Sequence, residues 1–283
     1  MKRLCRLFGL PKSTFYDREQ KEIEHVDKYA EIREKTVDIF HKSRGAAGQR
    51  TVVDILAAKN IAATRFIIRK LFLEEGLVSK QRRSKPYKKA DKASVIAPNL
   101  LNRYFDVGAP DSWWCGDVTY IWTQLGWCYL AAVLDLYSRK IVGFSVSKNP
   151  DSELTMKALL MAFESRGRPQ HLVFHSDQGC HYTSEAFRLK LEEYNIVQSM
   201  SRRGNCWDNA PMERFFGSIK SEWIPKLGYE NLADAVDDVH GYIHDYYNVD
   251  RPHTHNEGLP PTKAEARFQL ELKKLLVGNG QAG

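Results

Sequence analysis

The stretch WCGDVTYIWTQLGWCYLAAVLDLYSRKIVGFSV, residues 114–146, decides the fold of this chain. Residues 114–122 are rich in β-branched and aromatic side chains, which is typical of a strand. Residues 127–136 form a nearly continuous apolar run, which is typical of a central strand buried on both faces. Residues 141–146 form a third strand after a short turn. The stretch therefore predicts a sheet whose middle strand covers 127–136.

The chain beyond this stretch alternates between helical and strand patterns. Apolar residues at helical spacing predict a helix over 154–165, and the pattern then changes to strand, helix, strand and helix. The order β-β-β-α-β-α-β-α predicts a mixed α/β sheet flanked by helices. The later elements are expected at 171–175, at 184–194, at 196–200 and after Asn209.

The region before the sheet, residues 28–78, is predicted to be entirely helical. Its second helix covers 50–59, and Thr64 is placed to cap a third helix. Two short helices joined by a tight turn, the second with Arg65 and Arg69, are typical of a helix-turn-helix that binds DNA. A helical hairpin that only packs against the rest of the protein is the alternative.

Residues 79–110 are interpreted as a basic linker. Between positions 79 and 92, seven basic residues face a single acid, so most of the net charge of +7 lies in this segment. The segment is either a solvated tether or an arm that lies along DNA phosphates. In the second case the contacts are expected from Lys80, Arg82, Arg83, Lys88 and Lys89.

Composition limits the class of protein. The 283 residues are 43% hydrophobic, 27% charged and 11% aromatic, which excludes a disordered chain and a disulfide scaffold. No run of about 18 apolar residues occurs, so no membrane span is expected. The five cysteines are odd in number and form no Cys-x-x-Cys pair, which favours a reducing cytoplasm. The predicted parts are a partial helix-turn-helix-like segment (1–22), a helical domain (28–78), the linker (79–110), an α/β core (111–225) and a C-terminal helical extension with a tail (226–283).

Three acids stand at the edges of predicted elements in the α/β region. Asp117 lies in the first strand, Asp177 follows the strand over 171–175, and Glu213 lies near the start of the last helix. Ligand sites collect at one edge of an open α/β sheet. Carboxylates that lie close together repel one another, and divalent cations remove that repulsion. Two Mg²⁺ ions about 3.5–4 Å apart can promote an in-line phosphoryl displacement.

The sequence around these acids resembles one group of enzymes. Thirty-five residues separate Asp177 from Glu213. With that interval, five words of the sequence resemble the orfB-type transposases of bacterial insertion sequences, which belong to the DDE superfamily together with the retroviral integrases. The words are WCGDVTY (114–120), LDLYSRKIVG (134–143), HSDQGCHYTS (175–184), GNCWDNAPMERFF (204–216) and YNVDRPH (247–253).

The resemblance implies a ribonuclease-H-like core and a metal-dependent enzyme that cuts element ends and joins 3′-hydroxyls to target DNA. It implies that Asp117, Asp177 and Glu213 are catalytic and bind Mg²⁺ or Mn²⁺, as two ions. It also implies a DNA contact from Lys220, which is otherwise a solvated surface charge. The expected partners are double-stranded DNA of the element ends and the target, further copies of this chain, and an upstream-frame protein that supplies end recognition. The expected location is the bacterial cytoplasm, at the nucleoid.

Three further polar residues are candidates for supporting roles. His175 and Asn209 lie beside members of the acidic triad, where they either orient those acids or serve packing and capping. Asp135 lies in a strand next to the core, where it either approaches the site or has a structural role. Two other functions stay open at this point. One is a non-catalytic DNA-binding regulator from a decayed element, and the other is a structure-specific nuclease.

Overall fold

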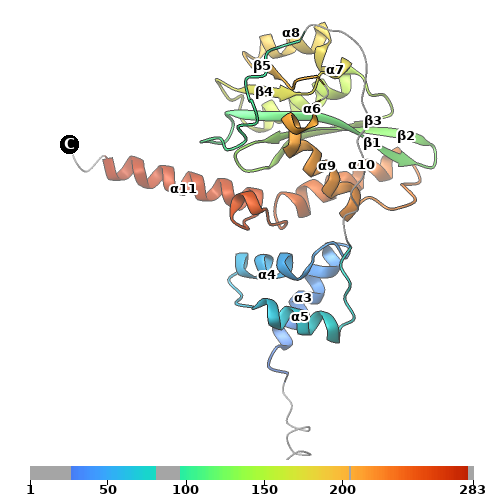
Figure 1. Cartoon of the computed structure of the whole chain (residues 1–283), viewed down its shortest axis with the longest axis vertical. Coiled ribbons are helices and arrows are strands. Elements are labelled where there is room, and N and C mark those ends of the chain that lie inside the picture. Colours follow the sequence, from blue (N-terminus) through green and yellow to red (C-terminus); the bar gives the residue numbers. More distant parts are fainter. Residues whose placement is uncertain (1–26, 81–95, 204, 280–283) are drawn as a thin grey trace, which may run out of the picture.

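A five-stranded mixed sheet forms the centre of the computed structural model, which describes residues 27–80, 96–203 and 205–279 (Figure 1). The strand order is β3-β2-β1-β4-β5; β1, β2 and β3 are antiparallel neighbours, and β4 and β5 run parallel to β1. The predicted α/β sheet is confirmed. The strands are β1 (Trp113–Thr123), β2 (Gly126–Asp135), β3 (Ile141–Ser147), β4 (Val173–Ser176) and β5 (Val197–Met200).

Helices cover both faces of this sheet. The side chains of β2 alternate between the two sides: Leu130 and Leu134 pack with the helices after β5, whereas Ala131 and Val133 pack with the helices between β3 and β5. The central strand is therefore buried on both faces, as its apolar run predicted. One face carries α6 (Ser152–Ser165), α7 (Cys180–Thr183) and α8 (Glu185–Glu193), and the other carries α9 (Ala210–Glu222), α10 (Leu232–Gly241) and the π-helical turn η2 (Tyr242–Tyr247).

The helix α6 lies directly on the backbone of β3. A Cβ atom built on Gly143 would lie 2.3 Å from the carbonyl oxygen of Ala158 and 2.6 Å from the amide nitrogen of Ala162. Both neighbouring atoms belong to the helix backbone, so they cannot move aside as a flexible side chain would. The absence of a side chain at Gly143 thus sets the distance between helix and sheet.

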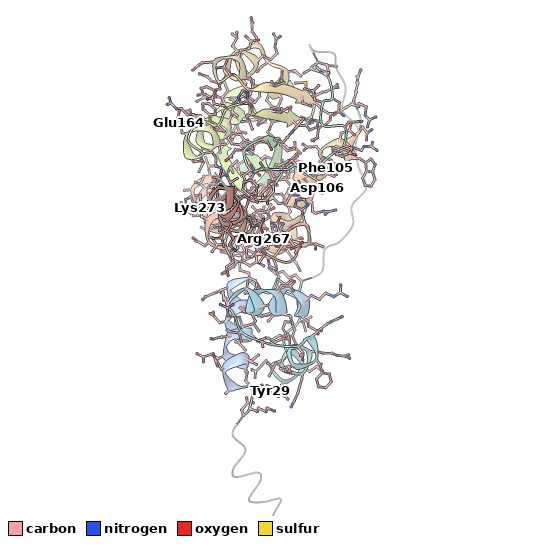
Figure 2. All side chains as sticks on the ribbon, turned by 90° about the vertical axis from the view of Figure 1, so that its left-hand side faces the viewer. Tyr29, Phe105, Asp106, Glu164, Arg267 and Lys273 are labelled. Carbon is pink, nitrogen blue, oxygen red and sulfur yellow. The ribbon has the colours of Figure 1, made fainter. Side chains whose placement is uncertain are left out.

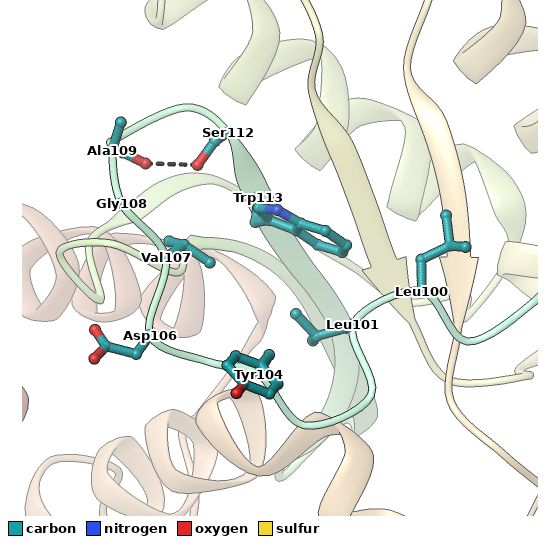
Figure 3. Close-up of a pocket in the computed structure, with 9 residues that line it drawn as sticks. All are labelled: Leu100, Leu101, Tyr104, Asp106, Val107, Gly108, Ala109, Ser112 and Trp113. Carbon is teal, nitrogen blue, oxygen red and sulfur yellow. Dashed lines mark hydrogen bonds between the residues drawn. The ribbon is translucent and has the colours of Figure 1, made fainter.

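We therefore expect Gly143→Ala to lower the free energy of unfolding by about 1–3 kcal/mol, because overpacking a core costs that much. Urea denaturation of the purified protein measures the change. Gly108→Ala is the matched control, because Gly108 lies in the loop before β1, where an added Cβ meets no atom within 4 Å (Figure 3). Equal stability of the two variants would contradict the close approach of α6.

The C-terminal region continues the core rather than starting a new one. Tyr229, Val239 and Tyr242 are buried in the same hydrophobic cluster as α9 and the sheet. The predicted boundary at residue 225 stays a prediction, and the packing runs across it. The chain then forms the short helix η3 (Thr254–Asn256) and α11 (Pro261–Asn279), which runs away from the sheet (Figure 1). None of the helices in the described ranges combines the length and hydropathy that a membrane span needs.

The helical domain comprises α3 (Ala30–Lys42), α4 (Gln49–Ala58) and α5 (Arg65–Glu74), which enclose a hydrophobic cluster of their own. The predicted cap at Thr64 is confirmed, because its side chain accepts a hydrogen bond from the amide of Ile67 at 3.4 Å. The segment 1–22 and the linker residues Arg82, Arg83, Lys88 and Lys89 lie outside the described residues.

The helical domain lies beneath the core and contacts it along what we call the seam (Figures 1 and 2). Arg44 pairs with Asp238 and lies with its guanidinium 4.2 Å from the ring centre of Trp223. Lys59 lies 3.4 Å from the carboxylate of Asp250. The linker residue Lys80 also belongs here, since its ammonium donates to the carbonyl of Glu222 at 3.2 Å.

Candidate active site

Two of the three predicted acids lie where β1 and β4 separate. The two strands pair only over three residues, and the last pair joins Cys115 to His175. Asp117 lies two residues after Cys115, and Asp177 lies two residues after His175. Asp117 lies in β1 and Asp177 directly follows the end of β4, so the parallel pairing of the two strands brings both acids to the same edge of the sheet.

The pKa of Asp117 indicates which charged groups lie near it. Burial raises the pKa of the Asp117 carboxyl well above its ordinary value, and the negative charges of Asp177 and Glu213 raise it further. The amide of Val118, which donates to Asp117 Oδ1 at 2.7 Å, and the positive charge of Lys220 act in the opposite direction. The three acids and the lysine that the sequence singled out are therefore close enough to interact through their charges.

The loop after β4 holds Asp177 in place. Asp177 Oδ1 accepts a hydrogen bond from the amide of Gly179 at 2.9 Å. A Cβ on Gly179 would lie 2.9 Å from that same oxygen and 2.8 Å from Nε2 of His181, so a larger residue would displace one of these two side chains. Burial and the charges of Asp117 and Asp177 raise the pKa of Tyr182 well above its ordinary value. Tyr182 thus lies beside both acids with its side chain buried.

Glu213 reaches the site on α9, whose start is fixed by two polar anchors. The buried Asn209, at the end of the short helix η1 (Cys206–Asn209), donates to the carbonyl of Gly116 at 3.2 Å, next to Asp117. Asp208 accepts from Arg103 Nε at 2.8 Å and from Arg202 Nε at 2.9 Å. These bonds tie the beginning of α9 to β1 and to two loops, one turn before Glu213.

Lys220 lies two turns beyond Glu213 on α9. Its ammonium is 4.1 Å from the ring centre of Tyr120, three residues after Asp117 on β1. A cation over an aromatic face gains about 0.5–1 kcal/mol at an exposed site. The contact holds the charge of Lys220 along β1, near the acids, although the side chain as a whole is exposed.

The oxygen donors of this site fit a hard divalent cation. Carboxylates that raise one another's pKa are relieved by a positive charge between them, and Mg²⁺ and Mn²⁺ prefer oxygen ligands. Within the described ranges, no group of three or more His, Cys, Asp or Glu side chains is placed to hold a metal ion. Mg²⁺ does not require one, because it usually binds one or two carboxylates and completes its shell with waters and substrate phosphates.

The predicted supporting residues make different contacts. His175 is fully buried, and its ring nitrogens lie 2.9 Å from Ser199 Oγ and 3.1 Å from Ser201 Oγ, which links β4 to the chain around β5. Asp135 is also fully buried and accepts from the amides of Asp111 at 2.6 Å and Tyr137 at 2.8 Å, at the far end of β2. These contacts favour structural roles for both, whereas the bond from Asn209 to Gly116 favours an orienting role.

The predicted DNA contacts of the helical domain lie together on α5. Arg65 and Arg69 are exposed and line an open pocket of about 500 Å³ with Gln49 and Phe66. Phe66 is 80% exposed. One face of α5 therefore presents two cations and an aromatic ring to the solvent.

Comparison with known proteins adds independent information. Residues 108–206 match a family model described as an integrase core domain, and residues 194–261 match a second model with the same description. An insertion element IS600 protein of Shigella sonnei is 34% identical over 267 residues, which cover 94% of this chain and 98% of that protein. The chain belongs to the insertion-sequence transposases. Its function is accordingly that of a DNA transposase or integrase, with polynucleotidyl transferase activity.

Two further transposases show how far the similarity extends. The transposase of IS904 from Lactococcus lactis is 37% identical over 225 residues, which cover 79% of this chain and 88% of that one. Transposase InsF of IS3A from Escherichia coli is 31% identical over 270 residues, covering 94% and 93%. Among solved structures, the HTLV-2 integrase catalytic core domain in complex with magnesium covers 56% of this chain and 97% of its own, at 23% identity and a TM-score of 0.44.

Sequence reasoning missed several residues around the three candidate acids. Asp208, Gly179, His181 and Tyr182 lie inside words that carried the resemblance, yet their roles depend on contacts with distant segments. Tyr120 was missed as well. Its only signal was an aromatic at an exposed position of a strand, three residues after an acid.

The buried His175 predicts a pH dependence of stability. Burial lowers the pKa of His175 from 6.5 to about 4, so the folded protein accepts the proton less readily than the unfolded chain. Its contribution is complete above pH 6.5, and about 3 kcal/mol is lost as the pH falls from 6.5 to 4. We expect His175→Gln to lose less stability than the wild type over this range. Urea denaturation near pH 7 and near pH 4 measures the difference, and identical losses would refute the assignment.

Proposed function

We propose that the protein cleaves the ends of its insertion element and joins the resulting 3′-hydroxyls to target DNA by the two-metal chemistry of the DDE superfamily. Asp117, Asp177 and Glu213 would hold two Mg²⁺ or Mn²⁺ ions. When bound, such ions activate the attacking oxygen and stabilise the leaving oxygen of a phosphoryl displacement. The reaction changes only bonds to phosphorus, so the protein has to position the reacting phosphate of the DNA.

One observation carries this proposal. The pKa of Asp117 is raised well above its ordinary value by burial and by two further carboxylates that come from other elements of the fold. A structural role does not require three acids to lie close enough to interact through their charges, because their repulsion destabilises the folded state. Bound cations would offset this repulsion, and the reaction of the family requires such cations.

The residues around the triad have supporting tasks in this proposal. Asn209 and Asp208 hold the start of α9 against β1, and Gly179 holds the loop of Asp177. Lys220 would bind a backbone phosphate near the acids. The contact of its ammonium with the ring of Tyr120 already holds the Lys220 side chain along β1. The exposed face of α5, with Arg65 and Arg69, would bind DNA as a recognition helix, with Lys80 at the seam and the four basic linker residues as further phosphate contacts.

The partners follow from the reaction. Element ends and target DNA are both double-stranded substrates, and joining two ends requires at least two copies of the active site or of the chain. Exposed Leu272, Leu275 and Leu276 on α11 support contacts between copies. An upstream-frame protein that contributes end recognition, and a location at the bacterial nucleoid, remain predictions. The regulator hypothesis lacks a reason for the three acids, while a nuclease would differ only in using water as the nucleophile.

Asp177→Asn tests the triad. The amide keeps the shape of the carboxylate but removes a ligand charge, so end cleavage and joining should fall by more than the roughly 10–100-fold that the loss of an outer-shell partner costs. The apoprotein should be as stable as the wild type or more stable, because repulsion with Asp117 is removed. Gel assays with DNA that carries the element end and Mg²⁺ or Mn²⁺ measure both products. Asp237→Asn, on the exposed side of α10, is the matched control.

Three outcomes of that assay separate the functions. Loss of both products in Asp177→Asn alone supports the proposal. Joined products from Asp177→Asn would remove the triad assignment. Cut products without any joined product in the wild type would favour the nuclease.

Lys220→Ala should slow end cleavage by on the order of a hundredfold at saturating DNA, because misplacing a reacting group by about 1 Å costs that much. Folding and cation binding should be preserved. Lys220→Arg should fall between the two, because it keeps the charge with a different shape. Lys226→Ala, in the loop after α9, is the control. Wild-type rates for Lys220→Ala would mean that this lysine is only a surface charge.

A further inference from the structure

A second charged site lies on the opposite side of α9 from the acids. A cavity of about 610 Å³ opens at the seam, between α4 of the helical domain and the outer face of α9. Arg214 and Ser218, one helical turn apart on α9, line this cavity. Arg50 lines it from α4, and Arg139 lines it from the turn between β2 and β3. Its walls come from five separate parts of the chain, which lie within 50–54, at 105, and within 134–139, 210–218 and 247–258.

The cavity has an excess of uncompensated positive charge. Arg251 also lines it, but its guanidinium is neutralised by Glu222 at 2.6 and 2.8 Å. Among the described residues, Arg50, Arg139 and Arg214 form no ion pair with a carboxylate. Two acids line the cavity as well, and one of them, Glu257, is paired with Arg267 at 2.6 Å. Asp54 is the other.

Two of the residues that line the cavity each have a buried polar atom without a hydrogen-bond partner. Arg139 donates from Nη2 to the carbonyl of Phe105 at 2.9 Å, while its Nη1 is buried with no hydrogen-bond partner among the described residues. Nε2 of His253 is also buried and has no hydrogen-bond partner among the described residues. Burial and the charges of Arg251 and Arg139 lower the pKa of His253 well below its ordinary value, as expected in a positive field. A buried polar atom that stays unpaired destabilises the folded protein, so such groups call for a partner.

The turn that carries Arg139 belongs to the sequence that identified the family. Arg139 has a φ of 62°, which places it in the tight turn between β2 and β3. The same turn belongs to one of the five family words, and His253 belongs to another. Neither word has a task in the acidic site.

We propose that this cavity binds a phosphate group of the DNA backbone through Arg50, Arg139 and Arg214. The proposal rests on the proposed function, which brings DNA to α9. Guanidinium groups match phosphate oxygens with paired hydrogen bonds, and three of them around one cavity would surround a single phosphodiester group. Because Arg214 follows Glu213 directly on α9, a phosphate at this site would fix the DNA relative to the helix that carries a catalytic acid. Because Arg50 belongs to α4, the same phosphate would also connect the helical domain to the core.

Binding of a labelled duplex DNA without divalent cations tests the site apart from catalysis. Each phosphate contact contributes about 0.9 to the slope of log K against log salt concentration. The double variant Arg50→Gln/Arg214→Gln, which changes two exposed side chains, should lower the slope by about 0.9 in total, because both side chains contact the same phosphate. Arg168→Gln, which removes an arginine on the far side of the core, should leave the slope unchanged. Thermal unfolding checks the folding of each variant.

Several outcomes would overturn the proposal. An unchanged slope would show that no DNA phosphate occupies the cavity. A fall of about 1.8 would mean two separate surface phosphates instead of a shared site. Inorganic phosphate serves as the second probe. If it raises the melting temperature of the wild type but not of the pair variant, while the DNA slope stays the same, the cavity binds a free anion and not DNA. The triad assignment depends on none of these results, since the Asp177→Asn assay measures chemistry alone.

Discussion

The packing of α9 against β1 is the contact on which the site depends. Met212, Phe215 and Ile219 of α9 are almost completely buried in the cluster beneath the sheet. Each such side chain contributes about 1.5–3 kcal/mol when it is removed from water. Two like charges about 4 Å apart cost on the order of 1 kcal/mol in water and about 4 kcal/mol near a protein surface. The apolar face of α9 is therefore strong enough to hold Glu213 close to two other carboxylates.

The topology of the sheet creates the space for this helix. Strand β1 continues eight residues beyond its last pair with β4, at Cys115. The loop after α9 then returns to the end of β1, where the amide of Tyr229 donates to the carbonyl of Trp122 at 3.1 Å. Between these two points α9 crosses the strand, anchored by Asn209 at one end and by this loop at the other. A longer β4 would fill the position that Asn209 takes, so the short pairing is a condition for the acidic site.

The sequence predicted what depends on local pattern and on words of the family. The apolar run over 127–136, the cap at Thr64 and the helix after Asn209 follow from periodicity and side-chain chemistry, and each is confirmed by the structure. The grouping of Asp117 with Asp177 and Glu213 came from words in a fixed order. The seam could not be predicted, because Arg44 meets Asp238 and Arg50 shares a cavity with Arg214 only after both domains have folded. Lys80 illustrates the same limit: a lysine in a charged linker has no local signal for a bond to the carbonyl of Glu222.

The two faces of α9 suggest how DNA binding and chemistry are connected. Glu213 and Lys220 lie on the side of the acids, whereas Arg214 and Ser218 lie on the side of the seam, so one rigid helix serves both sites. A ligand that binds only when α4 faces α9 stabilises that arrangement by an amount that grows with the logarithm of its concentration over its dissociation constant. At a hundred times the dissociation constant the amount is about 2.7 kcal/mol. DNA bound in the cavity would thus hold the helical domain on the core. It would also fix the position of the Glu213 carboxylate relative to the bound DNA backbone. Because linkage is reciprocal, DNA that engages the acidic site would favour the closed seam to the same extent.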